Sequence, residues 1–284
     1  MLIPNKKEKP LARWNVGGHI TSCGFDVLKE SIKTTRKVLD KYDFDYVICY
    51  NNLSVSRKME IKEYERQGIQ TLEQKWETCP IPFQECLNPV KADGSIEDNT
   101  GSVGGTLWKI TPPRLRINAH EIVMDNDVMI LNDFKELSLF LKSNKTMFSS
   151  NMPRFYGRYD KLFWECKENY NAGFVGMPPG FDFGAVLYEI WTTNERYKKL
   201  TYADEQGLSL AALRTEEHII LYNIVIELYK EGKMLKWNPE FWEPYAVTGD
   251  EKIFHFIQSN RHEAKDHKGW QSYKTLSLNG NSSG

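Results

Sequence analysis

The sequence contains no apolar run of about 18 residues, the length that a helix needs to cross a bilayer. Its first ten residues are rich in lysine but lack the apolar stretch of a secretory signal. From these two absences we expect a cytoplasmic protein without an integral membrane segment.

The sequence also lacks an excess of charge of one sign. Lysine and arginine number 37, aspartate and glutamate number 38, and the formal net charge is -1. Such a chain has no overall field that would attract nucleic acid or an anionic membrane. Nucleic acid is therefore not expected as a partner, and any phosphate binding must come from a local site.

Several familiar motifs are missing. The glycine cluster at 101–105 matches neither a P-loop nor the G-x-G-x-x-G pattern. The five cysteines are odd in number and lack paired spacing, which favours reduced structural thiols over zinc ligands or disulfides. No repeat and no linker rich in proline, glycine and serine divides the chain. We expect one domain over 1–275 and a disordered tail at 276–284.

The sequence does contain an alternation of strands and helices. Its first half predicts strands at 14–20, 44–50 and 69–72, and helices at 25–42 and 56–67. Further helices are expected at 133–141, 185–200, 206–213 and 216–231, and further strands at 146–149 and 252–258. Alternation of this length is typical of an α/β fold with a mainly parallel central sheet and helices on both faces.

Two carboxylates interrupt the apolar stretch at 120–131. Asp125 and Asp127 would point to the same face of a strand, and both would reach its C-terminal edge if the strand ends there. Ligands bind at that edge in open α/β sheets, and carboxylates suit Mg²⁺ or Mn²⁺ shared with phosphate oxygens. A calcium loop is excluded, because its fifth and sixth positions would be Met129 and Ile130. The segment predicts a metal–diphosphate site, and the alternative is a polar strand end without function.

Three other segments each have two interpretations. His255 lies in an apolar strand, either as a core histidine or as a further metal ligand, with Lys268 returning over a diphosphate. The segment Asn171-Ala172-Gly173 is either a tight strand–turn contact or a place where the chain passes close to a ligand. Asp204-Glu205-Gln206 opens a predicted helix. Its acidic side chains either interact favourably with the helix dipole, or one of them faces a sugar or acts as a general base. The residues alone leave these alternatives open.

In this order, the segments resemble the motifs of glycosyltransferases of the GT-A fold, which use nucleotide-sugar donors. Asp125-Asn126-Asp127 is similar to the D-x-D motif, 171–173 to the N-A-G segment and 204–206 to the D-E-Q segment. His255 with Lys268-Gly269-Trp270 resembles the terminal H-x-x-G-x-x-K-P-W element of the glycogenin and galactosyltransferase-like retaining enzymes, with a longer interval before the lysine and glycine in place of proline. The resemblance covers most of 14–270 and implies a GT-A, Rossmann-like fold.

The resemblance also implies roles for single residues. Asp125, Asp127 and His255 would hold Mn²⁺ or Mg²⁺ against the donor diphosphate. The residues that it places around the donor nucleotide and its sugar are Val16, Gly17, His19, Asn51, Asn126, Gly173 and Lys268. The residues that it places at the sugar or the acceptor as catalytic groups are Asn171, Asp204 and Glu205. Arg154 and Arg158 are either a clamp for the diphosphate or solvated surface arginines.

The implied activity is a metal-dependent hexosyltransferase that moves a sugar from a nucleoside-diphosphate sugar, expected to be a UDP-sugar, to a glycan or another hydroxyl acceptor. The resemblance favours the retaining branch, while the residues themselves do not decide between retention and inversion. A sugar nucleotidylyltransferase is one alternative, but it would usually carry a glycine-rich basic loop after the first strand, and residues 17–24 contain no lysine or arginine. The other is a non-catalytic sugar- or nucleotide-binding protein, which would have little need of Asp125, Asp127 and His255 together.

Overall fold

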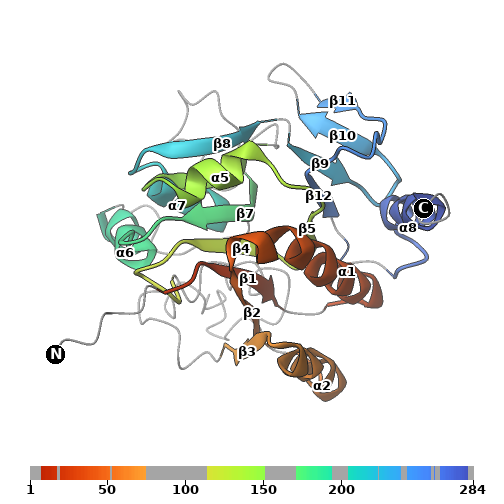
Figure 1. Ribbon diagram of the computed structural model, residues 1–284, viewed down its shortest axis with the longest axis horizontal. Helices are drawn as coiled ribbons and strands as arrows, with labels where there is room; N and C mark the ends of the chain where they lie inside the picture. The colour runs from red at the N-terminus through yellow and green to blue at the C-terminus, as the bar shows by residue number, and fades with distance from the viewer. Residues whose placement is uncertain are drawn as a thin grey trace, which may run out of the picture.

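The computed structural model describes residues 8–17, 20–51, 53–74, 114–150, 171–193, 204–222, 224–237, 242–256, 259 and 263–280. Within these residues the chain forms an α/β fold in which a larger and a smaller sheet are joined (Figure 1). This confirms the fold class predicted from the sequence.

The larger sheet has seven strands among the described residues, in the order β3-β2-β1-β4-β7-β6-β8. The strands are β1 (Leu11–Val16), β2 (Asp45–Tyr50), β3 (Gln70–Glu73), β4 (Glu121–Asp125), β6 (Thr146–Ser150), β7 (Asn171–Met177) and β8 (His218–Tyr222). Neighbouring strands run parallel except at β7, which is antiparallel to β4 and β6. The sheet is therefore mainly parallel, and the reversed strand β7 begins at the edge where β4 ends.

The smaller sheet has five strands in the described part of the chain, in the order β11-β10-β9-β12-β5. The strands are β5 (Val128–Ile130), β9 (Val225–Leu228), β10 (Met234–Trp237), β11 (Trp242–Pro244) and β12 (Ile253–Phe256). His255 on β12 is the register partner of Val128 on β5 and of Glu227 on β9. Because β5 follows β4 after only Asn126 and Asp127, the smaller sheet starts at the carboxyl edge of the larger one.

Helices cover both faces of the larger sheet. The helices of the described residues are α1 (Ser22–Leu39), α2 (Val55–Lys62), α5 (Lys135–Leu141), α6 (Phe183–Thr193), α7 (Asp204–Leu213) and α8 (Lys268–Gly280), with the 3-10 turns η1 (Asp40–Tyr42) and η2 (Glu63–Gln67). Of these, α8 packs against the smaller sheet. Residues of α1 and α5 share the main core with Met147 of β6. The hydroxyl of Thr146, on the opposite face of β6, donates to the Leu213 carbonyl of α7 at 2.7 Å. Across the described residues, no helix combines the length and apolar character that a membrane crossing requires.

The main core includes buried residues of α1, which packs against β5 (Figure 1). Phe25 and Ile32, on one side of this helix, are buried in it. Ser31 on the same side accepts the indole N–H of Trp14 at 2.9 Å and donates its hydroxyl to the carbonyl of Val128. These bonds link α1 to β1 and β5, so the turn between β4 and β5 is held in a fixed position relative to the helix.

One predicted helix is wrong. Residues 216–231, predicted as a helix, form β8 and β9, because Ile219, Leu221 and Val225 are buried in the main core. An apolar run of this length fits a buried strand as well as a helix, and tertiary packing decides between them. At the other end of the chain, α8 continues through Gly280 and overlaps the segment 276–284 where a disordered tail was expected. Once a helix is anchored by buried residues such as Trp270, each further residue adds a hydrogen bond.

Candidate metal and nucleotide site

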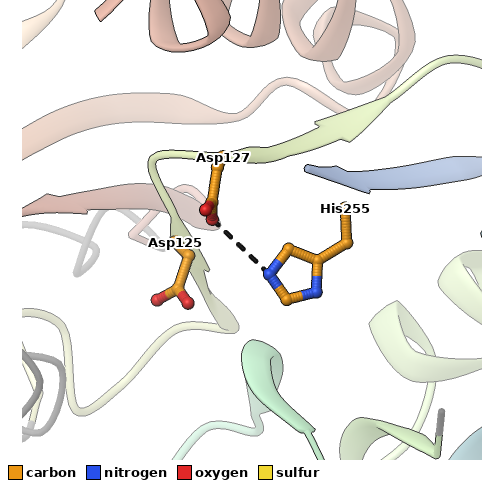
Figure 2. Close-up of side chains that lie close together, drawn as sticks. All are labelled: Asp125, Asp127 and His255. Carbon is orange, nitrogen blue, oxygen red and sulfur yellow. Dashed lines mark ion pairs between the residues drawn. The ribbon is translucent and has the colours of Figure 1, made fainter. Parts of the chain in front are cut away.

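Three predicted metal ligands converge where the two sheets join (Figure 2). Asp125 is the last residue of β4, Asp127 lies in the turn before β5, and His255 lies on β12. One ligand atom from each lies within 4.8 Å of the others, and all three residues are buried. Figure 2 shows the Asp127 carboxylate and the His255 imidazole pointing toward one another, with Asp125 beside them. The structure thus brings together a carboxylate pair and an imidazole from segments far apart in sequence.

The two carboxylates meet through a turn and not through alternation along one strand, as the sequence had led us to expect. β4 ends at Asp125, and Asn126 and Asp127 form the turn that leads into β5. The side-chain amide of Asn126 donates to the carbonyl of Gly24 in α1 at 3.4 Å. The hydroxyl of Ser259 donates to the Asp127 carboxylate at 3.2 Å. These contacts hold the turn from two sides, so the position of both carboxylates is built into the fold.

His255 lies between two carboxylates. Its Nε2 is 3.5 Å from Oδ1 of Asp127, and its Nδ1 is 3.5 Å from Oε1 of Glu227. Burial by itself lowers the pKa of His255, but Asp127 and Glu227 outweigh this effect and raise the pKa to about 10. The site therefore stabilises positive charge strongly enough to keep a proton on a buried imidazole at neutral pH.

The donor set fits a divalent cation. Carboxylate oxygens suit Mn²⁺ and Mg²⁺, and neutral imidazole is a common nitrogen ligand of metals. Metal ligands must be deprotonated, so a bound cation would take the place of the proton on the Asp127 side of His255. The residues that would hold it are Asp125, Asp127 and His255.

Asn171 and Gly173, at the start of β7, lie against the imidazole of His255. The Asn171 side-chain nitrogen is 3.1 Å from Oε1 of Glu227 and 3.3 Å from Nδ1 of His255, and its oxygen accepts the Gly173 N–H at 2.7 Å. A β-carbon built on Gly173 would lie 2.9 Å from that oxygen and 3.1 Å from Cε1 of His255. No side chain fits there without displacing the imidazole, which explains the glycine. The close approach in this segment is to His255, and its predicted roles at the donor sugar and in catalysis stay predictions.

Residues predicted to contact the nucleotide lie at the same edge of the sheet. Val16 ends β1 and is followed by Gly17, while Asn51 follows β2 and its N–H donates to the Val16 carbonyl at 3.1 Å. Since β1 pairs in parallel with both β2 and β4, with Asn15 opposite Asp125, these residues end beside the carboxylate pair. Asn126 belongs to the same edge, although its side chain bonds to α1.

The other predicted site residues either show no contact with the cluster or lie outside the described part of the chain. Lys268 is exposed at the start of α8, where its N–H donates to the Lys230 carbonyl at 2.9 Å and its side chain packs beside Gly232, so its contact with a diphosphate stays a prediction. Asp204 and Glu205 open α7, as predicted for a helix start. The residues whose side chains or positions lie outside the described part of the chain are His19, Arg154, Arg158, Asp204 and Glu205.

Sequence reasoning missed Glu227. This residue has no exposed surface and lies on β9 directly beside His255. Its second carboxylate oxygen accepts the hydroxyl of Tyr229 at 2.7 Å. The signal that would have found it is an acid inside the apolar run Val-Ile-Glu-Leu at 225–228, but the segment was predicted as part of a helix.

Comparison with known proteins identifies the fold. No protein-family model and no curated protein matches the sequence. Among solved structures, the galactosyltransferase LgtC in complex with donor and acceptor sugar analogs is similar, with a TM-score of 0.57, 10% identity and coverage of 95% of each chain. Mouse xyloside xylosyltransferase 1, in its apo form, has a TM-score of 0.50 and 10% identity over 89% of this chain and 99% of its own. The chain therefore has the GT-A fold of nucleotide-sugar glycosyltransferases, as its sequence motifs predicted.

Proposed function

We propose that this chain is a metal-dependent glycosyltransferase that moves a sugar from a nucleoside-diphosphate sugar, expected to be a UDP-sugar, to a hydroxyl of a glycan or another acceptor. The observation that carries the proposal is the buried cluster of Asp125, Asp127 and His255 at the carboxyl edge of a GT-A sheet. Ligands bind at this edge in open α/β sheets.

The cluster supplies what transfer from a diphosphate requires. Asp125, Asp127 and His255 would hold Mn²⁺ or Mg²⁺, which supplies a Lewis acid for the negative charge that develops on the departing diphosphate. The chain contributes the positions of these ligands before any donor binds, since Gly24 and Ser259 already hold the turn. Catalysis gains from such preorganisation because no group has to move into place during the reaction.

The nucleotide and the acceptor belong on either side of this cluster. Val16, Gly17 and Asn51, at the ends of β1 and β2, would border the base and ribose. Asp204 or Glu205, at the start of α7, would contact the sugar or the acceptor. In an inverting reaction one of these carboxylates would take the proton from the acceptor hydroxyl, whereas a retaining reaction has no obligatory base. The similarity of the His255 segment to retaining enzymes favours retention.

A thermal-shift panel tests the proposal. UDP, GDP, CMP and dTDP are added to the protein with and without Mn²⁺. A ligand that binds only the native state raises its stability by about 2.7 kcal/mol at a hundred times the dissociation constant, so UDP with Mn²⁺ is expected to raise the melting temperature most. Release of UDP from UDP-sugars in the presence of acceptors then measures transfer.

The outcomes separate the alternatives. A metal-dependent shift with one nucleoside diphosphate and turnover of its sugar conjugate supports the transferase. A shift without turnover of any conjugate points to a non-catalytic binding protein. The absence of a shift with every nucleotide contradicts both the donor class and the assigned site.

A further inference from the structure

Glu227 is a buried acid that the proposed reaction does not use. It occupies the position on β9 that pairs with His255 on β12, and in a parallel pair such partners project from the same face of the sheet. Its carboxylate has no exposed surface, although burying a charge without partners is very unfavourable. An apolar residue would fill the same space at lower cost, so the acid calls for a reason beyond packing.

Both oxygens of Glu227 are held in place. Oε1 accepts the side-chain amide of Asn171 at 3.1 Å, and Oε2 accepts the hydroxyl of Tyr229 at 2.7 Å. Oε1 is also 3.5 Å from Nδ1 of His255. The carboxylate is thus held by Asn171 of β7 and by Tyr229, the residue after β9, and it faces the Nδ1 side of the imidazole.

The imidazole itself has little freedom. Its Cε1 would be 3.1 Å from a β-carbon on Gly173, so the ring packs directly against the main chain of β7. The neighbouring ring atom Nε2 is 3.5 Å from Oδ1 of Asp127. Turning the ring over would replace a nitrogen with a carbon atom at both carboxylates.

We propose that Glu227 is a positioning residue, which holds His255 with the proton on Nδ1 and the lone pair of Nε2 directed at the metal site. A ligating imidazole nitrogen must be unprotonated, so the proton belongs on the other nitrogen and needs an acceptor. With the proton on Nδ1, the NH₂ group of Asn171 donates to Oε1 of Glu227, and the same carboxylate is the acceptor that faces the proton on Nδ1. Metal-ligating histidines commonly donate their second N–H to a carboxylate in this way. The inference rests on the proposed metal site and adds the residue that orients it.

The test is the dissociation constant of Mn²⁺ for the full chain, measured from the free Mn²⁺ signal in electron paramagnetic resonance. Glu227→Gln keeps the size of the side chain but removes its charge, and we expect the dissociation constant to rise about 10- to 100-fold. Tyr229→Phe leaves the carboxylate and removes one of its anchors, so a smaller rise in the same direction is expected.

A matched control is available in Glu251→Gln. Glu251 is also a buried acid, and its carboxylate accepts bonds from Thr248, Gly249 and the Tyr245 hydroxyl instead of from His255. Its neutralisation should leave the Mn²⁺ dissociation constant unchanged even if the melting temperature falls. A purely structural role for Glu227 predicts the same behaviour for both variants.

Three results would overturn the inference, and they can be told apart. If Glu227→Gln binds Mn²⁺ as tightly as the unaltered protein while Asp127→Ala does not, Glu227 has no positioning role but the metal site stands. If Asp127→Ala also retains the affinity, or the unaltered protein binds no Mn²⁺ saturably, the proposed metal site itself is wrong. If Glu227→Gln does not fold, Tyr229→Phe decides, and an unchanged dissociation constant then counts against the inference.

Discussion

Acidic residues stand at both ends of β4 and have different roles. Glu121, at the start, is fully buried with its oxygens 3.3 Å from Nη1 of Arg13 and 3.4 Å from Nε of Arg114. Asp125, at the end, instead lies beside a second acid, Asp127. The first carboxylate faces two guanidinium groups of the protein itself. The second pair lies with an imidazole in a cluster whose oxygen and nitrogen ligands suit a divalent cation.

The first residue-level prediction concerns Asp127→Ala. The variant should lose metal-dependent turnover of nucleotide sugars and the gain in melting temperature that Mn²⁺ gives the unaltered protein. In the absence of metal its melting temperature should stay within a few degrees, because a side chain in a turn contributes little to core packing. Thermal shift and release of the nucleoside diphosphate measure both effects. Undiminished turnover in a well-folded variant would contradict the assignment.

The second residue-level prediction concerns Gly173→Ala. Its new methyl group would meet the Asn171 oxygen at 2.9 Å and the His255 ring at 3.1 Å, so the ring must move. We expect a loss of about 1–3 kcal/mol of stability together with weaker Mn²⁺ binding. Denaturant unfolding and Mn²⁺ titration measure the two quantities.

Gly176→Ala on the same strand is the control for this prediction. A β-carbon there would lie 2.9 Å from the ring of Phe140, in the core and not at the metal site. It should lower stability by a similar amount and leave Mn²⁺ affinity intact. Equal loss of affinity in both variants would mean that the effect comes from overpacking of β7 in general.

Sequence reasoning reached some of these residues and not others for a physical reason. Asp125 and Asp127 were found because both acids lie in one apolar segment, and their convergence depends only on the local chain. The contact between Gly173 and His255 depends on how β7 and β12 are placed relative to each other. The pairing of Glu227 with His255 depends on the register between β9 and β12. No local pattern encodes either.

At the level of elements, several predicted segments correspond to observed ones. The predicted strand at 44–50 corresponds to β2, and the predicted helices at 56–67 and 206–213 correspond to α2 with η2 and to α7. The segment 216–231 failed because short apolar runs fit both kinds of element. Its two strands are stabilised by neighbours distant in sequence, since β8 pairs with β6 and β9 pairs with β12.

Helix α1 gives a prediction at this level. Ser31→Ala would leave the Trp14 indole N–H and the Val128 carbonyl without the hydroxyl that now joins them. Loss of a buried partner of this kind should lower the free energy of unfolding by about 1–3 kcal/mol, measured by denaturant titration. Thr34→Ala on the same helix is the control, because the Thr34 hydroxyl bonds only to carbonyls of its own helix, and its effect should stay within about 0.5 kcal/mol. Equal effects would show that α1 is not anchored through Ser31.

For the whole molecule, the alternation of elements and the order of four motifs were sufficient to predict the GT-A fold. The smaller sheet was not predicted, because four of its strands come from the second half of the chain and the fifth is the three-residue strand β5. The antiparallel direction of β7 was not predicted either, although this direction places Asn171 and Gly173 at the carboxyl edge of the larger sheet. Both features follow from non-local pairing, which the pattern of apolar residues does not specify.

The junction between the sheets has a mechanical consequence. Asp125 belongs to the larger sheet, His255 to the smaller one, and Asp127 to the short connection between them. An ion held by all three would link the two sheets at the point where the chain passes from β4 to β5 through two residues. Because the two sheets also share the main core through residues such as Val128 and Val225, the ion would add a local link to a joined structure, and we expect slower amide hydrogen exchange in β12 when metal is bound.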